Sequence, residues 1–548
     1  GHVHSLTLNN QSLIDFDRDR LHRETQRYLH GLEKQQELRI TRSRDSLGRL
    51  SEINFEGLQG LGTPPTLIGQ VTSHQYHYDP LDRLIAIQMP QQTLRYGYDG
   101  AGRLRSQSTY DTSAWLRAVN EAIAPEISQR WTIDPAGNRL PIPQLAGENR
   151  QQQDWAATVY QGWKDPSFNL LQADSASNPD GTVEQWPDNR IGYYEDQAWR
   201  YNTQGSRVEQ MSLKQNQQGQ YPRQRLSYDG ANQLTQVEIA RVIGRGYAVA
   251  ASQCRYIYDA LGRRLKKTYT DDQGQEHITY FGWDSDRQVR TETVRDDGTR
   301  HIVHTVYEPG VFAPMVRLSK TIQGDPQAKP SLLMQAAQAA WSITPNDPGV
   351  TAVLGSASKA MEQNIQYLLE DRLTPLSRSI IGRMGVDPDA LIARVRQGLE
   401  QAQQAQRATD IVVHYFHCNL LGTPLALTDQ QGQIVWAAQL DPWGNIEEEY
   451  NPQDIEQNIR LPGQYHDRET GLYYNRFRYY DPKIGVYINQ DPIGLAGGIH
   501  LYHYPFNPVT GMDPFGLDEK TINMRACPAL SPVQLFYFQI SFRLFFKP

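Results

Sequence analysis

Segments in which apolar and polar residues alternate recur along residues 1–329, and a turn signal follows most of them. In residues 95–98, for example, polar or small residues alternate with tyrosine, and Asp99 and Gly102 then mark a turn. A period of two residues predicts a strand with one buried face, while Asp and Gly favour the tight turn that joins two strands. This part of the chain is therefore predicted to be a succession of β-hairpins.

The hairpin signal is a sequence repeat whose core is aromatic-x-Tyr-Asp-x-x-Gly-Arg-Leu. Its clearest copies lie at residues 76–84, 96–104 and 256–263, and degenerate copies lie at residues 44–50, 131–140, 201–207 and 228–234. One hairpin is only marginally stable in water, so we expect neighbouring hairpins to stack side by side and to bury their Tyr and Leu side chains. The Arg and Asp residues beside the turns could pair across adjacent units and so fix the register.

The repeat stops near residue 330, and the apolar spacing of residues 330–409 changes to that of helices. Leu391, Val395 and Leu399 form one stripe after a helix-capping Asp-Pro pair. The simplest interpretation is a small helical insertion packed on or in the β structure, and the alternative is a plug or a helix pair that docks a partner. Strand character returns in residues 410–460.

Composition agrees with a mostly β chain and argues against one class of function. The 30 tyrosines and 42 glycines suit many short strands joined by tight turns. The formal net charge is -7, whereas nucleic-acid binding requires a basic surface, so we do not expect the β body to bind nucleic acid.

We expect neither a disulfide framework nor a metal site, and no cofactor. The three cysteines, Cys254, Cys418 and Cys527, are an odd number without metal-ligand spacing. His414 and His417 fall on opposite faces of one predicted strand, so a packed strand is the preferred interpretation there. We therefore expect the chain to fold in a reducing compartment.

No signal peptide or membrane-spanning segment is apparent. The chain does not open with a charged and then apolar segment, and no apolar run approaches the roughly 20 residues that a spanning helix needs. It begins with Gly1 rather than Met. This suggests a fragment, in which any upstream delivery or targeting domain would be missing from the sequence.

Candidate chemistry appears near the end of the chain, where residues 491–495, Asp-Pro-Ile-Gly-Leu, are echoed by residues 513–517, Asp-Pro-Phe-Gly-Leu. Two Asp side chains that meet can share one proton, which is the chemistry of aspartic proteases. Asp-Pro-x-Gly is also ordinary turn chemistry, and it recurs at Asp134 and Asp441. Only the doubled motif with a trailing Leu is distinctive. The residues that would set its two turns are Pro492, Gly494, Pro514 and Gly516.

The Tyr-Asp and Gly-Arg-Leu spacing resembles the YD repeats of Rhs (rearrangement hotspot) proteins, which are related to teneurins and to the C component of insecticidal Tc toxins. Residues 461–517 closely resemble the Rhs-associated core that closes the shell of that family. The resemblance implies a long spiralling β-sheet that forms a hollow shell, or cocoon, around a cargo polypeptide. It also implies the boundaries of the parts: a repeat shell at 1–329, a helical insertion at 330–409, further shell at 410–460, the core at 461–517 and a cargo at 518–548.

In that family an intramolecular aspartic protease cuts after the final Leu of the doubled motif. Carried over to matching positions, the catalytic pair is Asp491 and Asp513, and the scissile bond joins Leu517 to Asp518. Two close carboxylates cannot both ionise easily, so the pKa of one should rise and that group can hold a proton. Relatives usually carry an arginine after the glycine that precedes the motif, whereas here Val486 follows Gly485, so the resemblance supplies no basic contact there.

The residues between and after the two motifs show no further catalytic pattern. His500 and His503 are expected on a strand surface, since no nucleophile accompanies them. The tail, residues 518–548, is too short to bury a substantial core, and residues 536–546 alternate as a strand with one apolar face. We interpret it as a truncated or degenerate cargo.

The sequence thus predicts a self-cleaving, toxin-encapsulating shell of a secreted bacterial effector that serves interbacterial competition. By resemblance, the chain is made in the bacterial cytoplasm and delivered to a target cell by a machine such as a type VI secretion system. Its expected partners are its own cargo, an adaptor or secretion apparatus bound through a missing N-terminal region, and an immunity protein. The alternative is an extracellular adhesion or carbohydrate-binding protein with exposed aromatic rows and no proteolysis.

Overall fold

The computed structural model of the chain contains two units. The first comprises Gly1–Thr291, His304–Arg317 and Val413–Pro548, and the second comprises Glu292–Val303 and Leu318–Val412. The residues that the structure describes are 3–8, 11–31, 37–59, 62–113, 124–140, 187–194, 196–212, 216–243, 247–295, 298–322, 378, 389, 393, 411–517 and 519–521. The candidate site lies wholly in the first unit.

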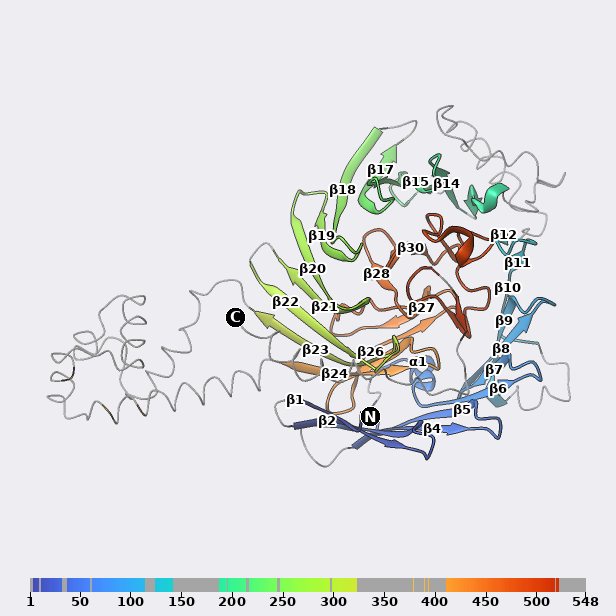
Figure 1. Cartoon of the computed structure of the whole chain (residues 1–548), viewed down its shortest axis with the longest axis vertical. Helices are drawn as coiled ribbons and strands as arrows, with labels where there is room; N and C mark the ends of the chain where they lie inside the picture. Colours follow the sequence, from blue (N-terminus) through green and yellow to red (C-terminus); the bar gives the residue numbers. More distant parts are fainter. Residues whose placement is uncertain are drawn as a thin grey trace. The chain divides into compact units, whose positions relative to one another are not determined.

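Strands dominate the described residues (Figure 1), and within each sheet the neighbouring strands are consecutive in the sequence. The first sheet consists of β1 (Ser5–Leu8), β2 (Gln11–Arg18), β3 (Glu24–His30), β4 (Glu37–Arg44), β5 (Leu50–Glu56), β6 (Ser73–Tyr78), β7 (Leu84–Gln88), β8 (Gln92–Tyr98), β9 (Leu104–Asp111) and β10 (Ile127–Arg130). Helix α1 (Pro65–Gln70) connects β5 to β6. A short pair, β11 (Thr132–Ile133) and β12 (Arg139–Leu140), follows. The prediction of a mostly β chain of hairpins is confirmed.

A second ladder repeats this pattern. It contains β13 (Tyr193–Tyr194), β14 (Gln197–Tyr201), β15 (Arg207–Ser212), β16 (Tyr221–Tyr228), β17 (Leu234–Ile243), β18 (Tyr247–Tyr258), β19 (Arg264–Thr270) and β20 (Glu276–Asp284). The chain continues through β21 (Arg287–Val294), β22 (Arg300–Tyr307) and β23 (Pro314–Ile322). Strands β24 (Val412–Cys418), β25 (Pro424–Thr428), β26 (Ile434–Leu440) and β27 (Ile446–Tyr450) again pair consecutively.

Asp, Gly and Arg build the turns of the repeat, as the loop after β8 illustrates. Asp99 Oδ1 accepts hydrogen bonds from the backbone N–H groups of Ala101 (2.9 Å) and Arg103 (3.0 Å), and Asp99 Oδ2 accepts one from Arg103 Nε (2.7 Å). Gly102 has a φ of 80°, which glycine adopts without strain. The same side-chain pair closes the turns that begin at Asp19, Asp45, Asp79 and Asp259.

Tyrosine links several successive units, because a Tyr that precedes a turn Asp donates a hydrogen bond to the first residue of an earlier returning strand. These bonds join Tyr78 to the Leu50 carbonyl (2.8 Å), Tyr98 to Leu84 (2.5 Å) and Tyr258 to Leu234 (2.7 Å). The expected ion pairing across units occurs between Arg49 and Asp82 at 2.7 Å. In the five turns named above, however, the arginine pairs with the Asp of its own turn, where it holds the turn rather than the register.

Residues 461–517 form a block of short strands that packs on the second ladder. Its sheet consists of β28 (Tyr465–Asp467), β29 (Leu472–Asn475), β30 (Arg478–Asp481) and β31 (Val486–Tyr487). Side chains of both parts share one apolar cluster, which includes Leu226, Val237, Cys254, Leu472, Tyr479 and Ile488.

Two fully buried arginines of the ladder anchor this block. Arg207 Nη1 lies 2.6 Å from Asp481 Oδ2, and Arg264 Nη1 lies 2.5 Å from Asp467 Oδ2. An unpaired buried charge costs several kcal/mol, so each pair strongly disfavours displacement of the block. The block therefore provides a fixed platform for the residues that follow it.

Parts of the predicted organisation fall outside the described residues. Of residues 330–409, only Arg378, Asp389 and Ala393 are described, and all three are helical. The remainder of the predicted helical insertion lies outside the described residues, as do residues 522–548 with the predicted apolar strand of the tail. Among the helices of the described residues, none has the length and apolar character to cross a bilayer.

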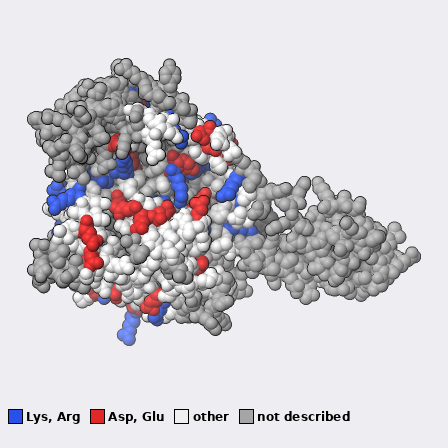
Figure 2. Space-filling view, turned by 180° about the vertical axis from the view of Figure 1, so that it is seen from behind, with Lys and Arg blue, Asp and Glu red and all other residues white. Residues whose placement is uncertain are grey.

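Charges of both signs are interspersed over the described part of the face shown in Figure 2. Basic and acidic side chains alternate there, and the described residues of this face present no continuous basic surface. Electrostatic attraction to a nucleic-acid backbone depends on such a surface.

Candidate functional site

One arginine brings the two predicted catalytic residues together. Arg478, in β30, is almost completely buried, and its Nη2 atom lies 3.0 Å from Asp491 Oδ2 and 3.4 Å from Asp513 Oδ2. A single guanidinium nitrogen therefore contacts both carboxylates. No arginine follows Gly485 in the sequence, but Arg478 supplies a basic group at this site. The sequence pattern assigned no role to Arg478.

Arg478 also forms hydrogen bonds with the backbone before and after Asp513. Its Nε atom donates a hydrogen bond to the Gly516 carbonyl (2.6 Å), and its Nη1 atom donates one to the Leu501 carbonyl (3.0 Å). The guanidinium carbon lies 3.7 Å from the centroid of the Tyr487 ring, which places the cation over the ring face. These contacts fix the cation beside the residue that precedes Leu517.

Asp513 is surrounded by hydrogen-bond donors. Its Oδ1 atom accepts from the backbone N–H groups of Gly516 (2.8 Å) and Leu517 (3.0 Å), and its Oδ2 atom accepts from the Tyr487 hydroxyl (2.9 Å). Burial, with the Asp513 charge as the next cause, raises the pKa of Tyr487 well above its ordinary value, so the phenol keeps its proton and donates. The Asp513 carboxyl group thus accepts two hydrogen bonds from the backbone and one from a phenol.

Asp491 has the opposite environment. Its Oδ1 atom accepts one backbone hydrogen bond, from Ile493 at 3.0 Å. Burial raises the pKa of Asp491 and the nearby charge of Asp513 raises it further, while Arg478 opposes both effects. Of the two carboxyl groups, Asp491 is therefore better suited to carry a proton.

The carbonyl of Leu517 lies beside Asp491. A Cβ atom built on Gly497, the last residue of the short 3-10 helix η3 (Gly494–Gly497), would lie 2.6 Å from the Leu517 carbonyl oxygen and would collide with Asp491 Oδ2. Both oxygens thus approach the same glycine. The Leu517 carbonyl, predicted to belong to the scissile bond, is therefore close to Asp491. Asp518, on the other side of that bond, lies outside the described residues.

Each of the two motif turns has its glycine in the left-handed region. Gly494 has a φ of 59° and Gly516 a φ of 71°, and Pro492 and Pro514 follow the two aspartates. A Cβ on Gly516 would lie 2.7 Å from the Asn475 carbonyl oxygen, so this turn is pressed against the end of β29.

The other two Asp-Pro-x-Gly turns differ from this pair at the residue four positions after the Asp. Asn138 Nδ2 donates to Asp134 Oδ2, and Asn445 Nδ2 donates to Asp441 Oδ2, each at 2.8 Å. The corresponding residues of the doubled motif are Leu495 and Leu517, whose side chains cannot donate. The Oδ2 atoms of Asp491 and Asp513 are therefore left for Arg478 and Tyr487.

Three of the histidines considered in the sequence are buried and have separate partners. His500 is buried, with its Nε2 atom 2.6 Å from Asn138 Oδ1, so its expected position on a surface is wrong. Burial lowers the pKa of His500 to about 3. His414 lies 3.4 Å from Arg317 Nη1 and His417 2.9 Å from Thr428 Oγ1. Within the described ranges, no three His, Cys, Asp or Glu side chains are grouped to hold a metal ion.

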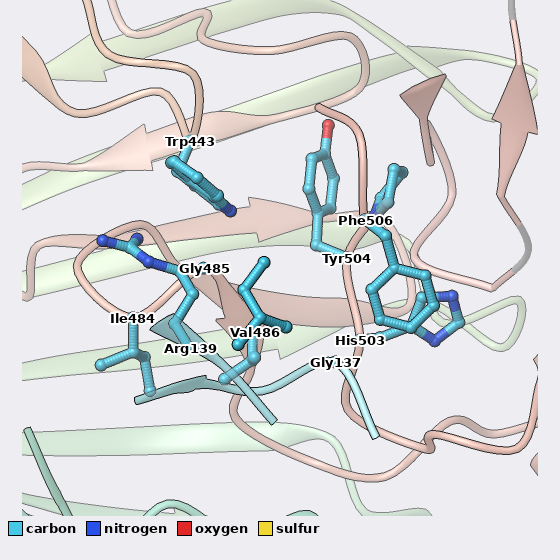
Figure 3. Close-up of a pocket in the computed structure, with 11 residues that line it drawn as sticks. Gly137, Arg139, Trp443, Ile484, Gly485, Val486, His503, Tyr504 and Phe506 are labelled. Carbon is cyan, nitrogen blue, oxygen red and sulfur yellow. The ribbon is translucent and has the colours of Figure 1, made fainter. Parts of the chain in front are cut away.

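A small cavity lies between β12 and the segment after β31 (Figure 3). Its volume of about 20 Å³ accommodates roughly one water molecule. Arg139 lies 4.2 Å from the centroid of the Trp443 ring on one side, and His503 is stacked on Phe506 on the other (Figure 3). The cavity has no room for a separate substrate.

Comparison with known proteins gives the following similarities. The family model described as RHS protein matches residues 413–450. Toxin protein Tse5 of Pseudomonas aeruginosa is 31% identical over 522 residues, which cover 94% of this chain and 32% of that protein. Double-stranded DNA deaminase toxin A of Burkholderia cenocepacia is 30% identical over 524 residues, which cover 94% of this chain and 27% of that protein.

Among solved structures, the Photorhabdus luminescens Tc holotoxin pore aligns with a TM-score of 0.46 at 16% identity, over 94% of this chain and 19% of that chain. The chain spans about a third or less of the length of the two curated relatives named above.

Proposed function

This chain belongs to the Rhs family of polymorphic toxins, and we propose on that premise that it encapsulates a toxin and cuts its own backbone after Leu517. The observation that carries the second part is the contact of one buried arginine with both Asp491 and Asp513, next to the Leu517 carbonyl. Buried carboxylates around a peptide bond are the requirement of an aspartic protease.

In the proposed reaction, the Asp513 carboxylate takes a proton from a water molecule whose oxygen adds to the Leu517 carbonyl carbon. The neutral Asp491 carboxyl gives its proton to the nitrogen of Asp518, and the carbon–nitrogen bond breaks. The products are a carboxyl group on Leu517 and an amine on Asp518, and one proton exchange with solvent restores the pair. This division of roles follows from the raised pKa of Asp491 and from the hydrogen-bond donors around Asp513.

Arg478 serves in this proposal as a positioning residue. Its charge lets one carboxylate remain ionised beside the other, and its bond to the Gly516 carbonyl holds the backbone that leads into Leu517. Tyr487 adds a neutral donor to the same Asp513 oxygen. The reaction needs neither a metal nor a cofactor.

The wider role is proposed from the family. The two relatives named above are toxins, and this chain spans only part of each, so we propose that its β body forms a hollow shell around a C-terminal cargo that begins at Asp518. Delivery by a type VI machine, binding to an adaptor or to the secretion apparatus, and an immunity protein for the cargo belong to the same proposal. Cutting inside a shell would free the cargo without exposing it.

The test is the intact mass of the purified chain under denaturing conditions, beside its Asp491→Asn and Asp513→Asn variants. We expect the native chain to end at Leu517 and both variants to retain all 548 residues. Asp441→Asn is the matched control, because Asp441 begins the same kind of turn, whereas Arg478 forms its ion pairs with Asp491 and Asp513. We expect this control variant to be cut. Cutting of Asp513→Asn to the native extent would exclude the proposed pair.

A further inference from the structure

The chain on both sides of the proposed scissile bond belongs to one hairpin. Strand β32 (Gly511–Met512) directly precedes Asp513, and β33 (Lys520–Thr521) follows the bond. The two strands pair antiparallel, with Gly511 opposite Thr521 and Met512 opposite Lys520. The residues between the strands, 513–519, therefore include the Asp513 base and the bond after Leu517. Main-chain pairing ties the two ends of this loop together.

Gly511 provides the space for this close approach. A Cβ atom built there would lie 2.8 Å from Glu519 Oε1 and 2.9 Å from the Asn507 carbonyl oxygen. Gly511 N–H also donates to that carbonyl at 2.7 Å, which fixes the strand from its upstream side. Glycine within a strand often marks a point where another segment approaches closely, and here that segment is the start of the cargo.

We propose that β32 is a binding site for the main chain of the first cargo residues, 519–521, and that this pairing sets the register that presents the bond after Leu517 to Asp491 and Asp513. The inference rests on the proposed self-cleavage and names how that reaction recognises its substrate. Pairing of an added strand uses N–H and C=O groups that nearly all residues share, so the site accepts cargo starts of varied sequence. Proline is the exception, because it has no N–H group.

The experiment compares Lys520→Pro/Thr521→Pro with the matched control Lys520→Ala/Thr521→Ala. The proline variant removes whichever N–H group the ladder uses, whereas the alanine variant removes both side chains and keeps both N–H groups. Each chain is made by cell-free translation, samples are quenched in denaturant over time, and intact mass gives the fraction cut after Leu517. We expect the alanine variant to be cut at the native rate and the proline variant about tenfold to a hundredfold more slowly, as for a misplaced reacting group.

The native chain and Asp513→Asn, run in parallel, separate the two proposals. If Asp513→Asn is cut like the native chain, self-cleavage by the pair is wrong and the inference fails with it. If Asp513→Asn stays whole and the proline variant is cut at the native rate, only the role of β32 is refuted.

Folding is checked in uncut chains by adding the two prolines to the Asp513→Asn background and comparing thermal unfolding. An unchanged Tm together with slow cutting supports the register role. A lowered Tm together with slow cutting would overturn it, because loss of structure would then explain the slower reaction.

Discussion

Gly497 lies against both Asp491 and the Leu517 carbonyl, and replacing it with alanine tests the proposed active site with a single methyl group. The φ of Gly497 lies outside the left-handed region, so its backbone admits alanine. The added Cβ would lie 2.6 Å from the Leu517 carbonyl oxygen and would collide with Asp491 Oδ2, whereas ordinary contact begins at 3.4 Å. The carbonyl, the carboxylate or both must therefore shift, the carbonyl oxygen by about 0.8 Å.

A displacement of about 1 Å between reacting groups costs about a hundredfold in rate, so we expect Gly497→Ala to be cut about a hundredfold more slowly than the native chain. The assay is the time course of intact mass after cell-free translation. Gly100→Ala is the control, because its Cβ would have no atom within 4 Å and its φ also lies outside the left-handed region. Native cutting of Gly497→Ala would refute the placement of Leu517 beside Asp491.

Two further predictions concern charge. We expect the Arg478→Met chain to remain uncut. The Arg478→Lys chain should be cut at an intermediate rate, because an ammonium group keeps the charge but not the planar set of contacts. Cutting of the Met variant at the native rate would contradict the positioning role. His417 is buried, and desolvation followed by the charge of Arg27 lowers its pKa to about 3 from 6.5. Below pH 6.5 the unfolded chain therefore binds more protons at His417 than the folded chain does. The free energy of unfolding consequently falls as the pH is lowered from 6.5 towards 3, and the loss is about 2 kcal/mol at pH 5. Thermal unfolding at pH 7 and pH 5 should show this loss in Asp513→Asn, and a smaller loss when His417→Gln is added; an equal loss in both would exclude His417 as its source.

Local patterns in the sequence were sufficient to predict the hairpins. The period of two residues reports a half-buried strand, and the turn residues that follow it report the hairpin. The doubled motif identified Asp491 and Asp513 because its signal lies within five consecutive residues. The alternative of exposed aromatic rows loses support, since Tyr76, Tyr96 and Tyr256 are buried.

The supporting residues of the site could not be predicted in this way, because they meet only through tertiary packing. Arg478 lies 35 residues before Asp513 in the sequence, between the aromatic residues Phe477 and Tyr479. His500 was expected on a surface, yet its partner Asn138 is 362 residues away. No spacing rule of strands or helices connects positions so distant.

The two kinds of Asp turn in this chain nevertheless differ by a feature that can be seen in the sequence. In five of the repeat turns the residue four positions after the Asp is arginine, as at Asp99 and Arg103, and its side chain donates to Oδ2 of that Asp. In the turns at Asp134 and Asp441 an asparagine does the same. In the doubled motif that position is leucine, whose side chain cannot donate to Oδ2, and a distant arginine binds this atom of both aspartates. The trailing Leu is distinctive for this physical reason: it leaves Oδ2 of each aspartate to the same buried arginine.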